Sequence, residues 1–203
     1  MAAPSIPGFS GSHTSSDRVV TPTRACFYGG MPRLATTIGV HAWTLEAWLD
    51  ALRDASVTQV LDVRQRRGVR GSRYAWANSV RLQAALAGAR IEYRHHRELA
   101  PTTELRQLQH REDARRGVGK RSRVELAADY RRRYLREILG QVALRPIVEA
   151  MPVDGAAALL CVEADPEACH RSLVAERLEA EFGLPVEHLT PPGYARMRSL
   201  DGS

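Results

Sequence analysis

The residue types best suited to chemistry in this chain are two cysteines and a histidine, Cys161, Cys169 and His170, which stand close together in the sequence. An apolar run over 156–162 predicts a buried strand, and the spacing of apolar residues after it predicts a helix over 169–182. Unpaired backbone N–H groups and the dipole at a helix start attract anions and lower the pKa of a thiol. We therefore expect the start of this helix to be a site of chemistry.

Cys169 is the candidate nucleophile, because the thiolate is the reactive form of cysteine and the neighbours of Cys169 favour it. Its alternative role is that of a half-buried residue that only packs. His170 can act as an acid or base near neutral pH, or it can hydrogen-bond a backbone carbonyl and hold the loop in place. Cys161 ends the apolar run, which favours a place in the core.

Charged residues at the ends of predicted strands complete the candidate site. The planar guanidinium of Arg171 suits phosphate or carboxylate, and its alternative role is an internal ion pair with Asp62 or Glu163. Glu163 is a candidate for acid or base function beside the cysteine and histidine. Asp62 and Arg64 are candidates for substrate contact, or for an ion-pair network that orients the site.

A basic loop follows the second predicted strand, and it interleaves arginines with glycines and two aromatic residues. Such a loop can hold phosphates and stack on a base. A solvated charged loop is the alternative, although it gives no reason for the two aromatic side chains. The arginines are Arg64, Arg66, Arg67, Arg70 and Arg73, and the substrate-binding candidates among the later residues are Arg73, Tyr74 and Trp76.

The sequence gives weak support for a metal or cofactor. The spacing between Cys161 and Cys169 is not that of a zinc ribbon, and the adjacent residues Cys169 and His170 cannot easily both bind one ion. A haem-attachment motif, a dinucleotide-binding glycine pattern and a phosphate-binding P-loop pattern are all missing from the sequence. We therefore predict no metal ligand and name no cofactor.

The chain has 203 residues and a formal net charge of +6, which would attract an anionic partner such as a nucleic acid or nucleotide. Lys120 is the only lysine, so arginine supplies nearly all of the positive charge, and a GC-rich genome also explains that bias. Three cysteines argue against a disulfide framework and fit a reducing compartment. With neither a membrane-length apolar run nor a signal-peptide pattern, we expect a cytoplasmic protein without a membrane partner. The oligomeric state stays open.

Strand and helix signals alternate from residue 31 to the end of the chain, whereas 1–30 has the composition of a flexible tail. Such alternation implies right-handed crossovers and a mostly parallel sheet covered on both faces. We therefore predict the α/β class, with a single three-layer, Rossmann-like domain over 31–203. The expected strands are 34–40, 57–63, 91–95, 156–162 and 186–189, and the expected helices are 44–55, 79–87 and 169–182, with a charged helical region over 102–151.

Titratable residues follow each of the first four predicted strands. In a parallel sheet, ligands bind beyond the carboxyl ends of the strands. We therefore expect one site built from several loops. The charged residues that should converge there are Asp62, Arg64, Glu163 and Arg171.

Short motifs occur in order along the predicted domain: Thr37-Ile38-Gly39, Asp62-Val63-Arg64, Ser72-Arg73, Glu98-Leu99, Leu160-Cys161-Val162-Glu163 and Cys169-His170-Arg171-Ser172. In these motifs the sequence resembles the family called domain of unknown function 488, from about residue 34 to residue 189. The resemblance implies an α/β fold but no activity. The chain departs from many relatives at His41-Ala42-Trp43, and its middle helical region is unusually rich in arginine, so its substrate can differ from theirs.

Three functions from different classes fit these observations. The first is an enzyme that acts on a phosphate-bearing substrate, a nucleotide or nucleic acid, with an arginine-rich anion site and a Cys-His pair. The second is a non-catalytic module that binds nucleic acid or nucleotide, which should keep its affinity when Cys169 is replaced by serine. The third is a thiol-redox, metal-binding or haem-binding protein, and a redox role requires Cys161 and Cys169 to lie near disulfide distance.

Overall fold

The computed structural model describes residues 33–119 and 122–194. The tail predicted for 1–30, and with it Cys26, lies outside the described residues. Within the described part of the chain, no helix has the length and apolar character needed to cross a membrane.

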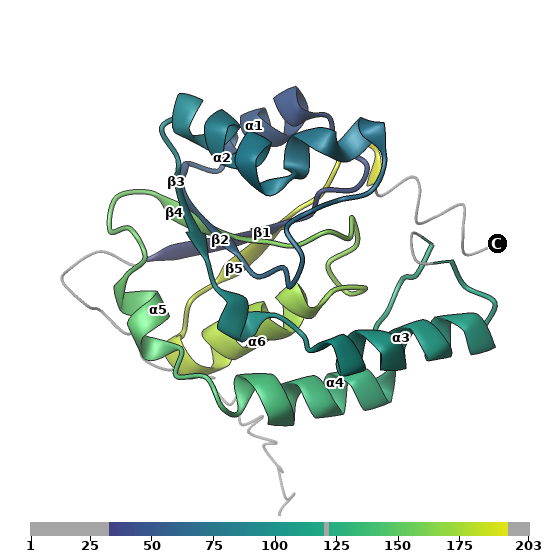
Figure 1. The fold of residues 1–203 in the computed structure, drawn as a ribbon. Helices are drawn as coiled ribbons and strands as arrows, with labels where there is room; N and C mark the ends of the chain where they lie inside the picture. Colours follow the sequence, from purple (N-terminus) through teal and green to yellow (C-terminus); the bar gives the residue numbers. More distant parts are fainter. Residues whose placement is uncertain (1–32, 120–121, 195–203) are drawn as a thin grey trace, which may run out of the picture.

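A five-stranded, fully parallel sheet forms the centre of the molecule, in the order β3-β2-β4-β1-β5 (Figure 1). The register aligns Ile38 at the end of β1 and Asp62 at the end of β2 with Leu160 at the end of β4. The carboxyl ends of these three neighbouring strands therefore meet at one edge. The strands are β1 Leu34–Ile38, β2 Val57–Asp62, β3 Glu92–His95, β4 Ala156–Leu160 and β5 Val186–Leu189.

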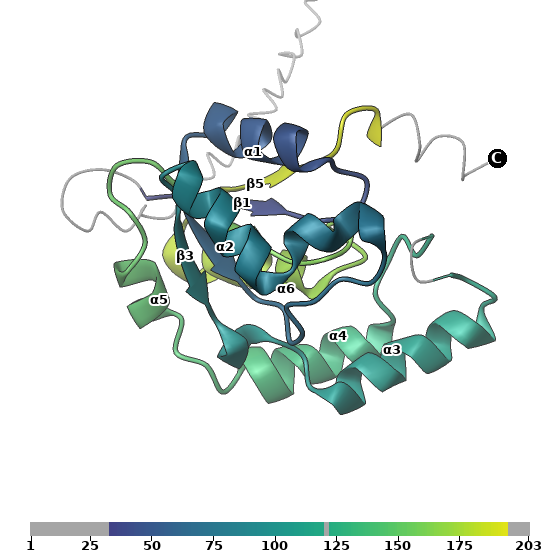
Figure 2. The same cartoon turned by 45° about the horizontal axis from the view of Figure 1, so that its top comes forward.

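Helices cover both faces of the sheet, so the predicted three-layer α/β fold is confirmed (Figures 1 and 2). One face packs against α1 (Leu45–Asp54) and α2 (Ser79–Gly88). The other face packs against α6 (His170–Phe182) and the helices of the middle region. These are α3 (Thr103–Arg115), α4 (Ala128–Tyr134), which continues into a π-helical turn (Leu135–Leu139), and α5 (Arg145–Glu149).

Local sequence signals fix several helix boundaries. The Thr44 hydroxyl caps α1 by accepting a hydrogen bond from the Ala47 N–H, as expected for a threonine before an apolar helix. Gly183 ends α6 in the left-handed conformation at φ 63°, which glycine adopts without strain. The charged region predicted to be helical resolves into α3, α4 with its π-helical turn, and α5, and α4 lies between α3 and α6 in contact with both (Figure 1).

Candidate functional site

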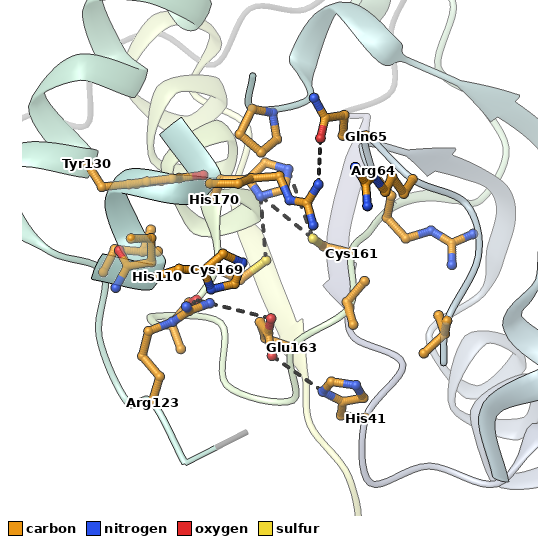
Figure 3. A pocket seen from close by; sticks show the side chains of 18 of the residues that line it. His41, Arg64, Gln65, His110, Arg123, Tyr130, Cys161, Glu163, Cys169 and His170 are labelled. Carbon is orange, nitrogen blue, oxygen red and sulfur yellow. Dashed lines mark hydrogen bonds and ion pairs between the residues drawn. The ribbon is translucent and has the colours of Figure 1, made fainter. Parts of the chain in front are cut away.

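A pocket of about 540 Å³ opens beyond the carboxyl ends of β2 and β4, where the strand-end rule places a site (Figure 3). Six segments line it: the loop after β1, the loop after β2, helix α3, the stretch that leads into α4, the loop after β4 and the start of α6. The polar and titratable residues in its lining are His41, Arg64, Gln65, Arg66, Arg70, Arg106, Gln109, His110, Arg123, Tyr130, Cys161, Glu163, Cys169 and His170.

Cys161, Cys169 and His170 form a compact cluster in the wall of this pocket (Figure 3). His170 Nδ1 lies 3.7 Å from Cys161 Sγ and 3.9 Å from Cys169 Sγ. The other ring nitrogen, Nε2, lies 3.0 Å from the Val63 carbonyl oxygen, which can only accept, so Nε2 carries a proton. In neutral His170, Nδ1 is therefore the bare nitrogen and lies near both sulfur atoms, while Cys161 Sγ is beside the ring, 4.0 Å from Nε2. The cluster can take a proton from a thiol.

The two thiols have pKa values shifted in opposite directions. Burial raises the pKa of both, and for Cys161 the hydrogen bond to Cys169 and the negative charge of Cys169 raise it further. For Cys169, the hydrogen bond from Cys161 and the positive charges of Arg171 and His170 outweigh burial, so its pKa lies well below the ordinary value. These opposite shifts favour a thiolate at Cys169 and a thiol at Cys161.

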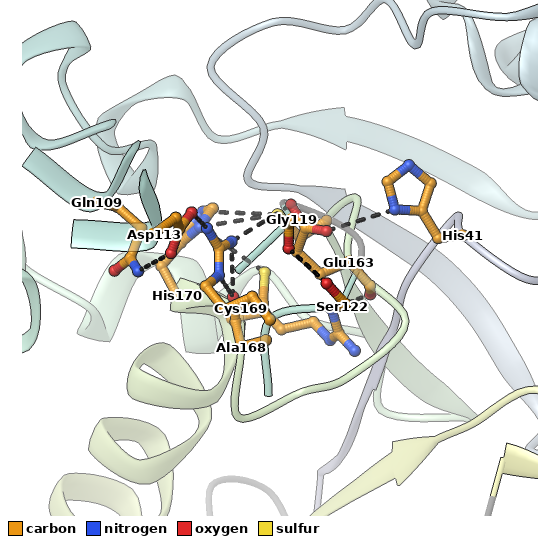
Figure 4. Close-up of polar contacts among 12 residues, drawn as sticks. His41, Gln109, Asp113, Gly119, Ser122, Glu163, Ala168, Cys169 and His170 are labelled. Carbon is orange, nitrogen blue, oxygen red and sulfur yellow. Dashed lines mark hydrogen bonds and ion pairs between the residues drawn. The ribbon is translucent and has the colours of Figure 1, made fainter. Parts of the chain in front are cut away.

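Glu163 lies between a histidine and an arginine in the same pocket (Figure 3), and its contact with His41 is also seen in Figure 4. Its Oε2 is 3.4 Å from His41 Nδ1, and its Oε1 is 3.4 Å from Arg123 Nη2. The His41 contact is an ion pair when that ring is protonated, but its Nδ1 is not aligned for a hydrogen bond with any described residue. Arg123 is held in turn by Asp113, at 2.8 Å, and by the Ala168 carbonyl. Glu163 is thus a buried carboxylate available for proton transfer.

Gly39 allows this arrangement, because the end of β1 passes very close to the loop after β4. A Cβ atom at Gly39 would lie 2.0 Å from the Glu163 carbonyl oxygen. The N–H groups of Val40 and His41 both donate to the Val162 carbonyl, at 3.0 and 2.9 Å. The glycine of the Thr-Ile-Gly motif therefore brings His41 next to Glu163.

Asp62 and Arg64 are bound to each other beneath the pocket. Asp62 is fully buried and accepts two hydrogen bonds from the Arg64 guanidinium, at 2.9 and 2.7 Å, and one from the Tyr93 hydroxyl. Arg64 donates its remaining terminal nitrogen, Nη1, to the Ala77 carbonyl. Arg64 lines the pocket but its donors are engaged, which favours the ion-pair role over direct contact with substrate.

Arg171 is fully buried, and it supports the loop that carries Glu163. It donates to the carbonyls of Glu163 and Ala164, at 2.6 and 2.9 Å, and to the Thr37 hydroxyl. It does not line the pocket. Of the four charged residues predicted to converge, Arg64 and Glu163 line the pocket. Asp62 binds Arg64, and Arg171 binds the loop that carries Glu163.

The remaining substrate-binding candidates lie outside the pocket lining. Arg73 is exposed and its guanidinium lies over the Tyr74 ring. The Tyr74 hydroxyl accepts a hydrogen bond from the Ala42 N–H, and its ring packs against His41. Trp76 packs against Trp48 in the core under α1 and α2. Tyr74 therefore contacts the pocket residue His41. The structure does not bring Arg73 or Trp76 to the pocket.

The model of the family "Domain of unknown function DUF488" matches residues 44–178, which is more than half of the chain. The chain belongs to this family. No curated protein and no solved structure matches the chain. The family match and the predicted resemblance cover nearly the same part of this DUF488 chain.

Several pocket residues of the DUF488 domain escape prediction from the sequence, because they lie in the charged region 102–151. Helix α3 buries Gln109 and Asp113 rather than a continuous apolar stripe. Gln109 donates to Asp113, at 2.7 Å, and accepts from the Ala127 N–H at the start of α4. Leu105, Gln109 and Asp113, spaced four residues apart on the buried side of α3, were the available signal. The pocket residues of this region are Arg106, Gln109, His110, Arg123 and Tyr130.

One group of side chains among the described residues can hold a metal ion. The Sγ atoms of Cys161 and Cys169 and a ring nitrogen of His170 all lie within 4.8 Å of one another. The expectation that adjacent Cys169 and His170 cannot easily both bind one ion rested on sequence spacing. The fold brings both side chains close together, with Cys161, directly after β4, as the third donor.

Proposed function

We propose that this protein is an enzyme that acts on a phosphate-bearing substrate, a nucleotide or nucleic acid, with Cys169 as the nucleophile. The observation that carries the proposal is the composition of one pocket. A thiol-imidazole pair faces arginines there, and these arginines form no ion pair with a carboxylate of the described residues. His170 Nδ1, 3.9 Å from Cys169 Sγ, accepts the thiol proton. Glu163, held between His41 and Arg123, donates or accepts a proton on the substrate.

Arg66, Arg70 and Arg106 supply the anion site in this proposal. All three line the pocket, and none forms an ion pair with a described carboxylate, in contrast to Arg64 and Arg123. Among the residues that the structure describes, Arg106 donates to the neutral Gln65 amide, at 2.7 Å, and to no carboxylate. Burial and then the positive charge of Arg66 lower the pKa of Arg106, so the two cations repel each other. A bound phosphate would relieve this repulsion and accept hydrogen bonds from the guanidinium groups.

Binding of phosphate compounds to the wild type and to Arg106→Gln tests the anion site. We expect pyrophosphate, nucleotides or a short single-stranded oligonucleotide to raise the melting temperature of the wild type, because a ligand stabilises the folded state that binds it. Arg106→Gln should weaken binding about tenfold or more, as expected for one lost charged hydrogen bond. Arg111→Gln, an exposed position on the same helix, is the matched control and should bind as the wild type does.

Turnover separates an enzyme from a binding module. Cys169→Ser should keep the affinity for a phosphate ligand that the wild type binds, but should lose turnover of phosphate esters and nucleotides. Equal turnover by wild type and Cys169→Ser excludes Cys169 as the nucleophile. Binding without turnover in either protein supports the non-catalytic module, and failure of all of these ligands to bind excludes both functions.

A thiol-redox function is the second candidate, and the placement of the two sulfurs favours it. Cys161 Sγ and Cys169 Sγ lie within 4.8 Å of each other, so a small movement would allow a disulfide. Peroxide treatment followed by mass spectrometry would detect a Cys161–Cys169 disulfide. A single oxidised Cys169 without a disulfide would contradict this function.

A further inference from the structure

We infer that Cys161, Cys169 and His170 form a three-ligand site for a soft metal ion of the Zn²⁺ class, with a fourth coordination position that faces the pocket. This site goes beyond the proposed function and does not depend on the substrate. It rests on the geometry of the three donor atoms, on the tautomer of the histidine and on the open space beside them.

The distances between the donor atoms match the edges of a tetrahedral zinc site. Zn–S bonds of about 2.3 Å and Zn–N bonds of about 2.0–2.1 Å place sulfur and nitrogen ligands about 3.6 Å apart. His170 Nδ1 lies 3.7 Å from Cys161 Sγ and 3.9 Å from Cys169 Sγ. All three donor atoms lie within 4.8 Å of one another. Cys161 Sγ is also 4.0 Å from His170 Nε2, so the spacings fit an ion once the His170 ring turns to point Nδ1 at it.

The tautomer of His170 is that of a metal ligand. Its Nε2–H donates to the Val63 carbonyl at 3.0 Å, which leaves Nδ1 as the nitrogen with a free lone pair. Metal-binding histidines almost always donate their second nitrogen to a carbonyl, carboxylate or water in this way. Two thiolates and a neutral imidazole suit Zn²⁺, and together with the ion they form a site without net charge, which limits the cost of burial.

The site has three protein ligands and space for a fourth. Among the described residues, the group consists of these two cysteines and this histidine. All three also line the pocket of about 540 Å³, so water or a ligand in the pocket can complete the coordination. Three protein ligands with an open position are typical of a reactive zinc site, whereas structural sites have four. An ion bound here would also occupy Cys169 Sγ, so metal binding and attack by this thiolate exclude each other.

Metal titration of chelator-treated protein tests this site. In a Cys26→Ser background, only Cys161 and Cys169 remain as thiols. We expect one Zn²⁺ per chain by calorimetry, and one Co²⁺ with the thiolate-to-cobalt absorption of a sulfur-bound ion. Cys161→Ser, Cys169→Ser and His170→Gln should each weaken binding at least about 100-fold, because loss of even an outer partner costs about 10- to 100-fold. His110→Gln, a histidine of the same pocket outside the group, should retain affinity.

A second measurement on the Cys26→Ser protein alone avoids the effect of a variant that fails to fold. Saturating Zn²⁺ should protect Cys161 and Cys169 together from alkylation, and a chelator should restore their reactivity. Absence of stoichiometric binding, binding unchanged by both serine variants, or alkylation unaffected by Zn²⁺ would each overturn the site. The proposed function is tested on chelator-treated protein with phosphate ligands, so either proposal can fail without the other.

Discussion

Cys169 differs from an ordinary helix-capping residue in the number of groups that stabilise its negative charge. The sequence indicated the helix start, His170 and Arg171, and the structure adds the thiol of Cys161 as a hydrogen-bond donor. This fourth contribution comes from a residue that the sequence placed in the core. Cys161 is buried, yet it also lines the pocket, so its two roles do not exclude each other.

We expect Cys169 in metal-free protein to be alkylated with a pH midpoint below the free-thiol value of about 8.5. Burial raises its pKa, but Cys161, Arg171 and His170 lower it further than burial raises it. Because only the thiolate reacts, the rate should reach its plateau at a lower pH than for an unfolded cysteine peptide. Iodoacetamide labelling against pH, followed by mass spectrometry, measures the midpoint independently of access. A midpoint for Cys169 at or above that of the peptide would contradict the prediction.

Asp62 is a residue whose loss should strongly reduce stability. It is fully buried and holds the Arg64 guanidinium with two hydrogen bonds. Asp62→Asn leaves the buried Arg64 charge without its partner, so we expect a loss of about 3–5 kcal/mol in the free energy of unfolding by urea. Asp50→Asn breaks the exposed pair with Arg53 and serves as the control, with an expected change below about 1 kcal/mol. Equal losses in the two variants would show that Asp62 and Arg64 do not act as a buried pair.

At the level of strands and loops, the end of β1 and the loop after β4 form one unit. Gly39→Ala would place a Cβ 2.0 Å from the Glu163 carbonyl oxygen and 2.8 Å from its carbon, both backbone atoms. We expect a loss of at least about 1–3 kcal/mol in stability, as for other overpacked positions, together with weaker ligand binding because Glu163 and His41 move. Urea unfolding and the phosphate-binding assay measure the two effects.

Gly88→Ala is the matched control for this substitution. Gly88 is the exposed last residue of α2, and a Cβ there meets nothing within 4 Å. Alanine should be neutral or stabilising by up to about 1 kcal/mol at this position. If Gly39→Ala and Gly88→Ala have the same free energy of unfolding, the close approach between the end of β1 and the loop after β4 does not limit stability.

The sequence predicted the position of every strand, but the first and fourth strands end two residues earlier than predicted and the second ends one residue earlier. The reason is that the backbone beyond Ile38 and Asp62 makes other bonds: Val40 and His41 bind the Val162 carbonyl, and Val63 binds the Leu160 carbonyl. These loop contacts join segments that are distant in sequence, so no local pattern reveals them. The same holds for the ion pair of Arg123 with Asp113 and Glu163, which decides which arginines stay available in the pocket.

For the molecule as a whole, the near absence of lysine shapes its response to alkali. Lys120 is the only lysine, and arginine stays protonated in this range, so tyrosine and cysteine ionisation account for most of the charge change between about pH 9 and 12. Burial, followed by the hydrogen bond to Asp62 and the charge of Asp62, raises the pKa of Tyr93 to about 12. Burial first, and then nearby negative charges, raise the pKa of Tyr130 and Tyr134 well above the ordinary value.

These raised pKa values predict a loss of stability in alkali. In the unfolded chain each tyrosine ionises near pH 10, whereas the folded protein holds these three neutral to a higher pH. Their contribution to stability is therefore complete below about pH 10 and is lost as the pH rises from there toward 12. Urea unfolding at a series of pH values should show this fall, and Tyr93→Phe should make it less steep because phenylalanine has no proton to lose.

Near-ultraviolet absorbance of phenolate follows tyrosine ionisation directly and should rise in two steps as the pH rises. The second step, from the three protected tyrosines, should occur together with unfolding. A single step near pH 10 for all tyrosines, in protein that stays folded by circular dichroism, would contradict the protected state of Tyr93, Tyr130 and Tyr134.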